Sequence, residues 1–169
     1  MKTPNSDVTQ TELMHMLDYN PATGVFLWKN PSKYQVSQKG KVAGRIDSGG
    51  YRQIAINKKR YAAHRLAWLY VYGKWPEALL DHKNLVKDDN RIENLRECTL
   101  INNCWNRRMR SDNTTGLKGV TPSYKGKFGS YIAVEGKNIY LGYFDTAEEA
   151  HAAYVVASKK YHGEFGRTA

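Results

Sequence analysis

A short polar segment, SDNTTG at residues 111–116, strongly limits how this chain can fold. The segment is rich in turn-forming residues and poor in apolar ones, a composition typical of a linker. It divides a chain of 169 residues into two parts, neither long enough to bury a large hydrophobic core. The sequence therefore predicts two small domains, residues 1–110 and 117–169, joined by a linker at 111–116.

The part after the linker has the pattern of a three-stranded antiparallel sheet packed on one helix. Residues 128–134 and 138–144 alternate in hydrophobicity around a tight turn, and an earlier strand is expected at 118–124. Thr146 and Glu149 form a capping box for a helix over 147–161, which Gly163 is placed to end. The expected core is Phe128, Ile132 and Val134 on the sheet and Ala147, Ala150, Tyr154, Ala157 and Tyr161 on the helix.

The part before the linker mixes helical and strand periodicities, so the chain as a whole belongs to the α+β class. A helix is predicted at 10–19, where Leu13, Met14 and Leu17 are helically spaced. Two more helices are predicted at 62–72, which Gly73 ends, and at 100–109, which Thr99 caps. Strands are predicted at 25–29, 51–56, 79–81 and 94–98.

Net charge gives the first indication of a partner. Lysine and arginine number 26 against 16 acidic residues, a formal charge of +10 with a pI near 9.6. Residues 1–110 carry +9 of this surplus and residues 111–169 carry +1. Such a surplus on a small chain suggests a polyanion such as nucleic acid, although solubility alone would also account for it.

Several classes of protein are disfavoured by what the sequence lacks. No apolar run approaches the ~20 residues of a membrane span, and the polar start, MKTPNSDVTQTEL, has no signal-peptide centre. Cys98 and Cys104 offer neither a disulfide framework nor a zinc site of four thiolates. We therefore expect a cytoplasmic protein with no membrane partner and no small-molecule cofactor.

Residues 79–108, LLDHKNLVKDDNRIENLRECTLINNCWNRR, contain the residue types that hydrolyse a phosphodiester. Hydrolysis needs a base for water and a cation for the developing charge. His82, at the end of a predicted strand, suits the base, and the oxygens of Asp81 and Asn103 suit a magnesium ion. Without further support, the same residues are equally consistent with turn chemistry in a polar loop.

This segment resembles the HNH nuclease motif, in the DH…N…N variant of phage proteins related to homing endonucleases. The resemblance covers about residues 60–108 and implies two strands and a helix around one divalent cation, Mg²⁺ or Mn²⁺. It implies His82 as general base, Asp81 and Asn103 as metal ligands, and Asn94 as the residue that braces the loop. Asn102 and Asn106 lie close enough to Asn103 that the second ligand is assigned only to within a few residues.

Other residues near the motif have two interpretations. His64 either meets a phosphate or is a partly buried, hydrogen-bonded histidine. Arg91 and Arg96 either stabilise phosphate charge or pair with Glu93 and Glu97. Residues expected to be structural are Trp68, Trp75 and Trp105 in the core, and His15, His151 and His162 as ordinary surface or helix residues.

Residues 116–166 resemble the DNA-binding domain of plant ethylene-response (apetala-two) factors, which also occurs fused to phage HNH endonucleases. The resemblance rests on KGKF, the YLGYFDTAEEAHAAY block and the closing Tyr-His-Gly. It implies a sheet that enters the DNA major groove with the helix behind it. Lysine, tyrosine, serine and threonine stand where the plant domains have arginine and tryptophan, so the target sequence is not carried over. The alternative for Lys125 and Lys127 is a solubilising surface hairpin.

Together these patterns predict a monomeric, metal-dependent, homing-like endonuclease that cuts double-stranded DNA, encoded by a phage and acting in the host cytoplasm. The alternatives are a DNA-binding regulator with an inactive nuclease scaffold and, less favoured, an RNA-binding protein. The candidate DNA-binding residues are Lys58, Lys59, Arg60, Arg107, Arg108, Lys118, Thr121, Ser123, Lys125, Lys127, Tyr131 and Tyr140.

Overall fold

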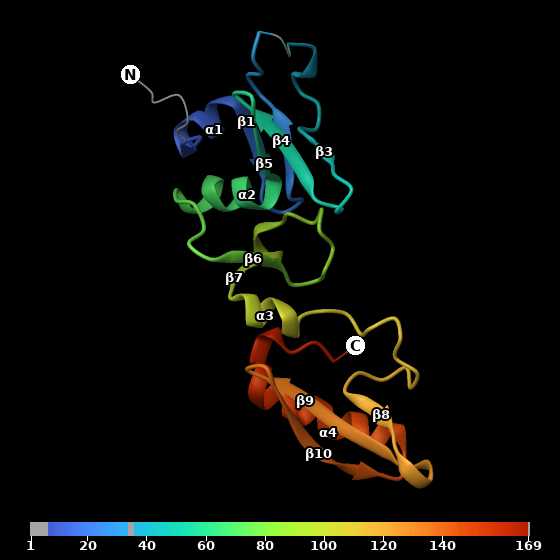
Figure 1. Ribbon diagram of the computed structural model, residues 1–169. Coiled ribbons are helices and arrows are strands. Elements are labelled where there is room, and N and C mark those ends of the chain that lie inside the picture. Colours follow the sequence, from blue (N-terminus) through green and yellow to red (C-terminus); the bar gives the residue numbers. More distant parts are fainter. Residues whose placement is uncertain (1–6, 34–35, 169) are drawn as a thin grey trace. The chain divides into compact units, whose positions relative to one another are not determined.

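The computed structural model describes residues 7–33 and 36–168, which form two compact units (Figure 1). The first unit ends at Cys98 and the second begins at Thr99. Residues 1–6 of the polar N-terminal segment lie outside the described residues. The boundary falls before the linker predicted at 111–116, because that segment is hydrogen-bonded into the second unit. The side-chain amide of Asn113 donates to the Leu117 carbonyl at 3.1 Å, and the side-chain oxygen of Asn113 accepts from the Gly116 amide at 2.8 Å. The predicted bounds of the functional domains stay a prediction.

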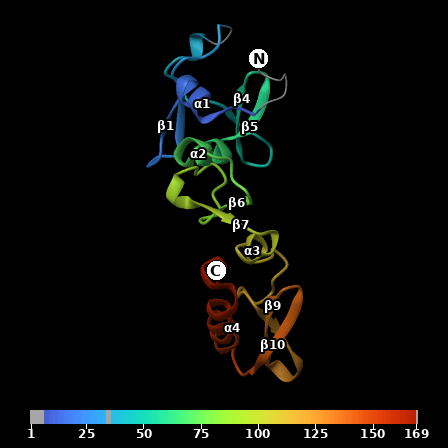
Figure 2. The ribbon, with the colours of Figure 1, turned by 90° about the vertical axis from the view of Figure 1, so that its left-hand side faces the viewer.

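The first unit consists of three small antiparallel sheets and two helices. The sheets are β1–β2, β3–β4–β5 and β6–β7, and α2 lies between the second and the third of them in both views (Figures 1 and 2). The elements are α1 (Gln10–Met16), β1 (Leu17–Asn20), β2 (Val25–Trp28), η1 (Val36–Gln38), β3 (Arg45–Ile46), β4 (Arg52–Ile56), β5 (Lys59–Ala62), α2 (Ala63–Tyr72), β6 (Leu79–His82), η2 (Ile92–Asn94) and β7 (Leu95–Cys98).

The core of this unit is formed by helices and strands that precede the candidate motif in the sequence. Leu13, Phe26, Ile54 and Leu66 are fully buried and come from α1, β2, β4 and α2. Trp68 and Trp75 pack against this cluster, as predicted. The predicted end of α2 is confirmed, because Gly73 adopts the left-handed conformation (φ 74°) in which glycine avoids a Cβ clash.

The helix predicted at 10–19 is wrong in its last turn. The helix ends at Met16, and Leu17–Asn20 form a strand paired with Val25–Trp28. Leu17 and Tyr19 are buried while Asp18 and Asn20 are exposed, which is the period of a strand. Pairing with β2 across the turn at 21–24 therefore determines the conformation here, and helical spacing within residues 10–19 does not reveal it.

The second unit is the predicted sheet on a helix, preceded by one short helix. Its elements are α3 (Leu100–Trp105), β8 (Val120–Pro122), η3 (Tyr124–Gly126), β9 (Phe128–Val134), β10 (Lys137–Phe144), α4 (Ala147–His162) and η4 (Gly163–Phe165). The strands form an antiparallel sheet in the order β10-β9-β8, and α4 lies along one face of it (Figure 2). The capping box of Thr146 and Glu149 is present, as is the Thr99 cap on α3.

Two details of this unit differ from expectation. The helix that begins at Leu100 ends at Trp105 rather than at 109, and the Lys118 ammonium donates to the carbonyls of Trp105 and Arg107 at 3.3 and 2.8 Å. The core of the sheet is Ile132 with Val134, Ile139 and Leu141, and Phe128 is not part of it. On α4 the buried residues are Ala150, Tyr154, Ala157, Ser158 and His162, and Tyr161 is exposed.

Candidate active site

The candidate catalytic residues of the first unit surround the loop between β6 and β7. Asp81 and His82 are the last two residues of β6, and each is 5% exposed. The register of the two strands places Asp81 opposite Arg96 and His82 opposite Leu95. The strand therefore holds the two candidate side chains in fixed positions, as expected from the sequence.

Asp81 is ion-paired to Arg96. The guanidinium Nη2 and Nε of Arg96 donate to the Asp81 Oδ2 at 2.9 and 3.1 Å, and the two side chains are 10% and 4% exposed. Of the two interpretations left open for Arg96, pairing with a carboxylate is the one seen, and the cross-strand register makes Asp81 such a partner. Arg91 does pair with Glu93, at 2.9 Å, and also with Asp89, whose pKa it lowers to about 2.

His82 is held by Asn90, a residue that the sequence analysis did not single out. The Nε2 of His82 lies 3.3 Å from the Oδ1 of Asn90, and Asn90 is only 1% exposed. Burial lowers the pKa of His82, while the Asn90 hydrogen bond and the nearby aspartates act in the opposite direction. A ring with a lowered pKa is neutral near pH 7 and can accept a proton from water.

Two further rings complete the surroundings of His82. The His64 ring on α2 meets it edge-on, with centroids 5.2 Å apart and planes at 78°. The Tyr51 ring lies 5.5 Å from His64 and 6.0 Å from His82. Burial is the main cause that lowers the pKa of His64 to about 4, so this ring is neutral at physiological pH. Its Nδ1 is buried and has no hydrogen-bond partner within the described part of the chain.

Asn94 makes contacts that brace the loop. Its side-chain carbonyl accepts from the Asn84 amide nitrogen at 3.1 Å, and its side-chain amide donates to the Asn84 Oδ1 and to the Asp89 carbonyl at 3.0 and 2.8 Å. A second tie comes from β4, where Arg52 binds Asp88 through two hydrogen bonds of 2.8 and 2.7 Å. The loop that carries Asn90 is therefore held at both ends.

Asn103 lies on α3, in the second unit, and is half-buried. Asn102 uses its backbone amide to complete the Thr99 cap, and Asn106 is 4% exposed. The donors that the sequence offers to a cation, the Asp81 carboxylate and the Asn103 amide, are oxygen ligands, which fit Mg²⁺ or Mn²⁺ better than zinc. Within residues 7–33 and 36–168, three or more His, Cys, Asp or Glu side chains nowhere come together as a metal site. Asn103 as second ligand stays a prediction.

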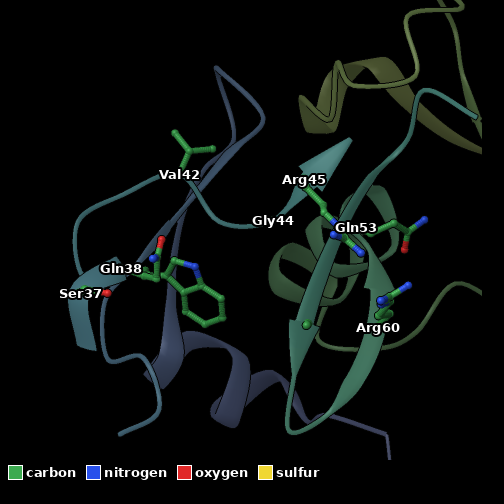
Figure 3. Close-up of a pocket in the computed structure, with 9 residues that line it drawn as sticks. Ser37, Gln38, Val42, Gly44, Arg45, Gln53 and Arg60 are labelled. Atoms are coloured by element: carbon green, nitrogen blue, oxygen red, sulfur yellow. The ribbon is translucent and has the colours of Figure 1, made fainter. Parts of the chain in front are cut away.

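The candidate DNA-binding residues of the first unit lie at the β4–β5 turn. Asn57 and Lys58 have φ of 50° and 66°, the left-handed values of a tight hairpin turn. Lys59 pairs with Asp7. Arg60 lines a hollow of about 390 Å³ together with Arg45 and Gln53, on the outer face of β3–β5, as Figure 3 shows.

In the second unit the sheet face away from α4 carries Thr121, Tyr131, Tyr140 and Tyr143, here called the tyrosine face. The rings of Tyr131 and Tyr140 are 5.4 Å apart, and those of Tyr140 and Tyr143 are 5.2 Å apart. Tyr143 was missed in the sequence because strict alternation would point it toward the helix. A bulge between Tyr140 and Gly142 shifts the register and returns Tyr143 to the outer face.

The remaining candidates of the second unit differ in their availability. Lys118 is half-buried against the carbonyls of Trp105 and Arg107, and its pKa is lowered to about 8, mainly by burial. Lys127 pairs with Asp145 at 3.0 Å. Arg107 and Arg108 are exposed after α3, and Ser123 and Lys125 lie at the η3 turn. His162, expected to be ordinary, is buried and stacked on Trp105 with centroids 4.3 Å apart.

Comparison with known proteins places the motif in a family. Residues 61–103 match the family model of the HNH endonucleases. A solved structure of the HNH homing endonuclease I-HmuI, described for its DNA binding and cleavage, is similar with a TM-score of 0.41 and 18% identity, covering 86% of this chain and 84% of that one. No curated protein matches the chain. At this level of structural similarity the assignment rests on the family model, which identifies residues 61–103 as an HNH endonuclease domain.

Proposed function

We propose that the chain is a metal-dependent, homing-like endonuclease that hydrolyses phosphodiester bonds of double-stranded DNA as a monomer. The observation that carries this proposal is the buried Asp81–His82 pair at the end of β6, inside the segment that matches the HNH family. A neutral, hydrogen-bonded histidine beside a carboxylate is the arrangement that activates water next to a cation.

In the proposed reaction His82 accepts a proton from the attacking water. Asp81 and Asn103 would hold one Mg²⁺ or Mn²⁺, which, when bound, stabilises charge on the phosphate and the leaving oxygen. Asn94 keeps the loop in place through Asn84 and Asp89. Arg96 neutralises Asp81 within the protein, so the buried carboxylate is not left as an isolated charge.

The test is cleavage of supercoiled plasmid with Mg²⁺ by the full chain. Replacing the base in His82→Ala should lower the cutting rate by ~10²–10⁴-fold. His15→Ala is the matched control, because His15 is exposed on α1. Equal cutting by the wild type and His82→Ala would contradict the assignment. DNA binding without any cutting by the wild type would favour the alternative, a DNA-binding regulator with an inactive nuclease scaffold.

We further propose that the second unit is a DNA-binding module of the ethylene-response-factor type that contacts DNA through the tyrosine face. Tyr140 and Tyr143 are 49% and 57% exposed and their rings lie 5.2 Å apart, and a contiguous exposed aromatic patch of this kind is typical of a binding surface. The single replacements Tyr140→Ala and Tyr143→Ala should each weaken duplex binding about tenfold, since one good groove contact is worth ~1–3 kcal/mol. Tyr161→Ala on α4 is the control, and equal affinity of all three variants would contradict the proposal.

A further inference from the structure

The side chain of Asn90 has no assigned role, yet it is the hydrogen-bond partner of the proposed base. Its Oδ1 lies 3.3 Å from the His82 Nε2. The orientation of the amide follows from its other contacts, because the Nδ2 donates to the Asp88 carbonyl at 3.0 Å. The oxygen is therefore the atom directed at the imidazole.

An amide oxygen can only accept a hydrogen bond, so the facing ring nitrogen must carry the proton. In the neutral imidazole only one nitrogen is protonated, and the lone pair then lies on the other. We propose that Asn90 is a positioning residue that keeps the His82 proton on Nε2 and so makes Nδ1 the atom that takes the proton from water. This inference rests on the proposed role of His82 as the general base.

Asn90 is itself held from several sides. The Tyr19 hydroxyl donates to the Asn90 carbonyl at 2.7 Å, and burial is the main cause that raises the pKa of Tyr19 to about 12, so this donor keeps its proton. The turn after β1 also lies close to the backbone of Asn90 and Arg91. A Cβ at Gly24 would lie 2.4 Å from the Arg91 nitrogen and 2.5 Å from the Asn90 carbonyl carbon.

These contacts distinguish Asn90 from the other asparagines of the loop. Asn84 and Asn94 bond to each other and to the loop backbone, whereas Asn90 uses its oxygen on the imidazole. The side chain is 1% exposed, so bulk solvent does not compete for that oxygen. The geometry therefore fixes the tautomer of His82 before substrate binds.

The test combines ¹⁵N NMR of the histidine rings with plasmid cleavage, both on the full chain. In the wild type the neutral His82 ring should show its proton on Nε2. Asn90→Leu keeps the side-chain size but removes the acceptor, so the proton should redistribute between the nitrogens and cutting should slow by ~10²-fold. Asn90→Asp keeps an acceptor oxygen for Nε2 but loses the donor to the Asp88 carbonyl, so it should keep the proton on Nε2 even where cutting slows.

Asn84→Ala is the control for a loosened loop, since Asn84 bonds to Asp89, Val86 and Asn94 but not to His82. It should leave the His82 proton on Nε2. A His82 ring that stays protonated on Nε2 in a folded Asn90→Leu variant would overturn the inference, as would equal slowing by Asn84→Ala and Asn90→Leu. If Asn90→Leu does not fold, loss of the Nε2 proton in folded Asn90→Asp overturns it. The proposed function fails separately, through equal cutting by the wild type and His82→Ala, and the NMR result stands in either case.

Discussion

Buried His64 should make the first unit sensitive to acid. Its pKa is lowered from 6.5 to about 4, mainly because the ring is buried, and its Nδ1 has no hydrogen-bond partner among the residues described. The unfolded chain therefore binds a proton at this histidine as the pH falls below about 6.5, while the folded chain stays neutral until about 4. Stability contributed by the neutral ring is complete above pH 6.5 and is lost as the pH falls through that window.

The magnitude follows from the two pKa values. The difference corresponds to about 3 kcal/mol at full effect and to about 2 kcal/mol at pH 5. In His64→Phe no group titrates at this position, and no hydrogen bond of Nδ1 is lost because none exists among the described residues. The wild type should therefore lose about 2 kcal/mol more unfolding free energy than His64→Phe between pH 8 and pH 5.

The assay is urea unfolding followed by tryptophan fluorescence, since Trp28, Trp68 and Trp75 all belong to the core of the first unit. Other groups that titrate in this range, His82 included, are present in both proteins and largely cancel in the difference. His15→Phe, a change at an exposed histidine, should keep the wild-type pH dependence. Equal losses in the wild type and His64→Phe would refute the reasoning, because the penalty for charging His64 would then be absent.

Three further predictions concern the same unit. Arg96→Met should lower the unfolding free energy by ~3–5 kcal/mol, because it leaves the Asp81 carboxylate buried without its guanidinium. The double variant Asp81→Leu, Arg96→Met should recover most of this loss in urea unfolding. A loss below about 1 kcal/mol in the single variant would show that the pair contributes little to stability. Gly24→Ala should destabilise by ~1–3 kcal/mol, since φ is +73° and the new Cβ would meet the Asn90–Arg91 backbone; an unchanged melting temperature would contradict this. Chelation by EDTA should abolish plasmid cutting and added Mg²⁺ or Mn²⁺ should restore it, so that cutting in the chelator would rule out the metal-dependent mechanism.

Local sequence signals predicted most elements because their causes are local. Thr99 and Thr146 cap helices, Gly73 ends one, and the Glu135–Gly136 turn joins two strands with φ of 50° and 79°. Each of these features is determined by residues within a few positions of one another.

Among the described residues, no helix is both long enough and apolar enough to cross a membrane.

Two of the errors come from strand pairing, which the period of a single segment does not reveal. Residues 17–19 leave the helix because β2 offers a strand partner, and Tyr143 changes face because of a bulge. Gly142 at that bulge has φ of 136°, a value open to glycine, but its presence in the sequence does not reveal which neighbour is displaced.

Within the candidate site, the sequence identified residue types but not partners. The motif singled out Asp81 and His82, which are buried together at the end of β6, and their catalytic roles stay a prediction. Arg96 as partner of Asp81 depends on the β6–β7 register. Asn90 is one of several Asp and Asn residues in DDNRIEN, and only the folded loop shows that its oxygen faces His82.

The distribution of ion pairs refines what the net charge of the first unit implies for DNA. Much of its positive charge is neutralised internally, as in Arg52 with Asp88 and Arg96 with Asp81. In contrast, Arg45 and Arg60 have no carboxylate partner in the described part of the chain and line the hollow beside β3–β5 (Figure 3). Lys58, at the β4–β5 turn, has none there either. A guanidinium group without a carboxylate partner has all of its N–H donors available to bind phosphate oxygens. Lys39 and Lys41 are exposed and also have no carboxylate partner among the described residues, so the charge available to a DNA backbone includes this sheet and extends beyond it.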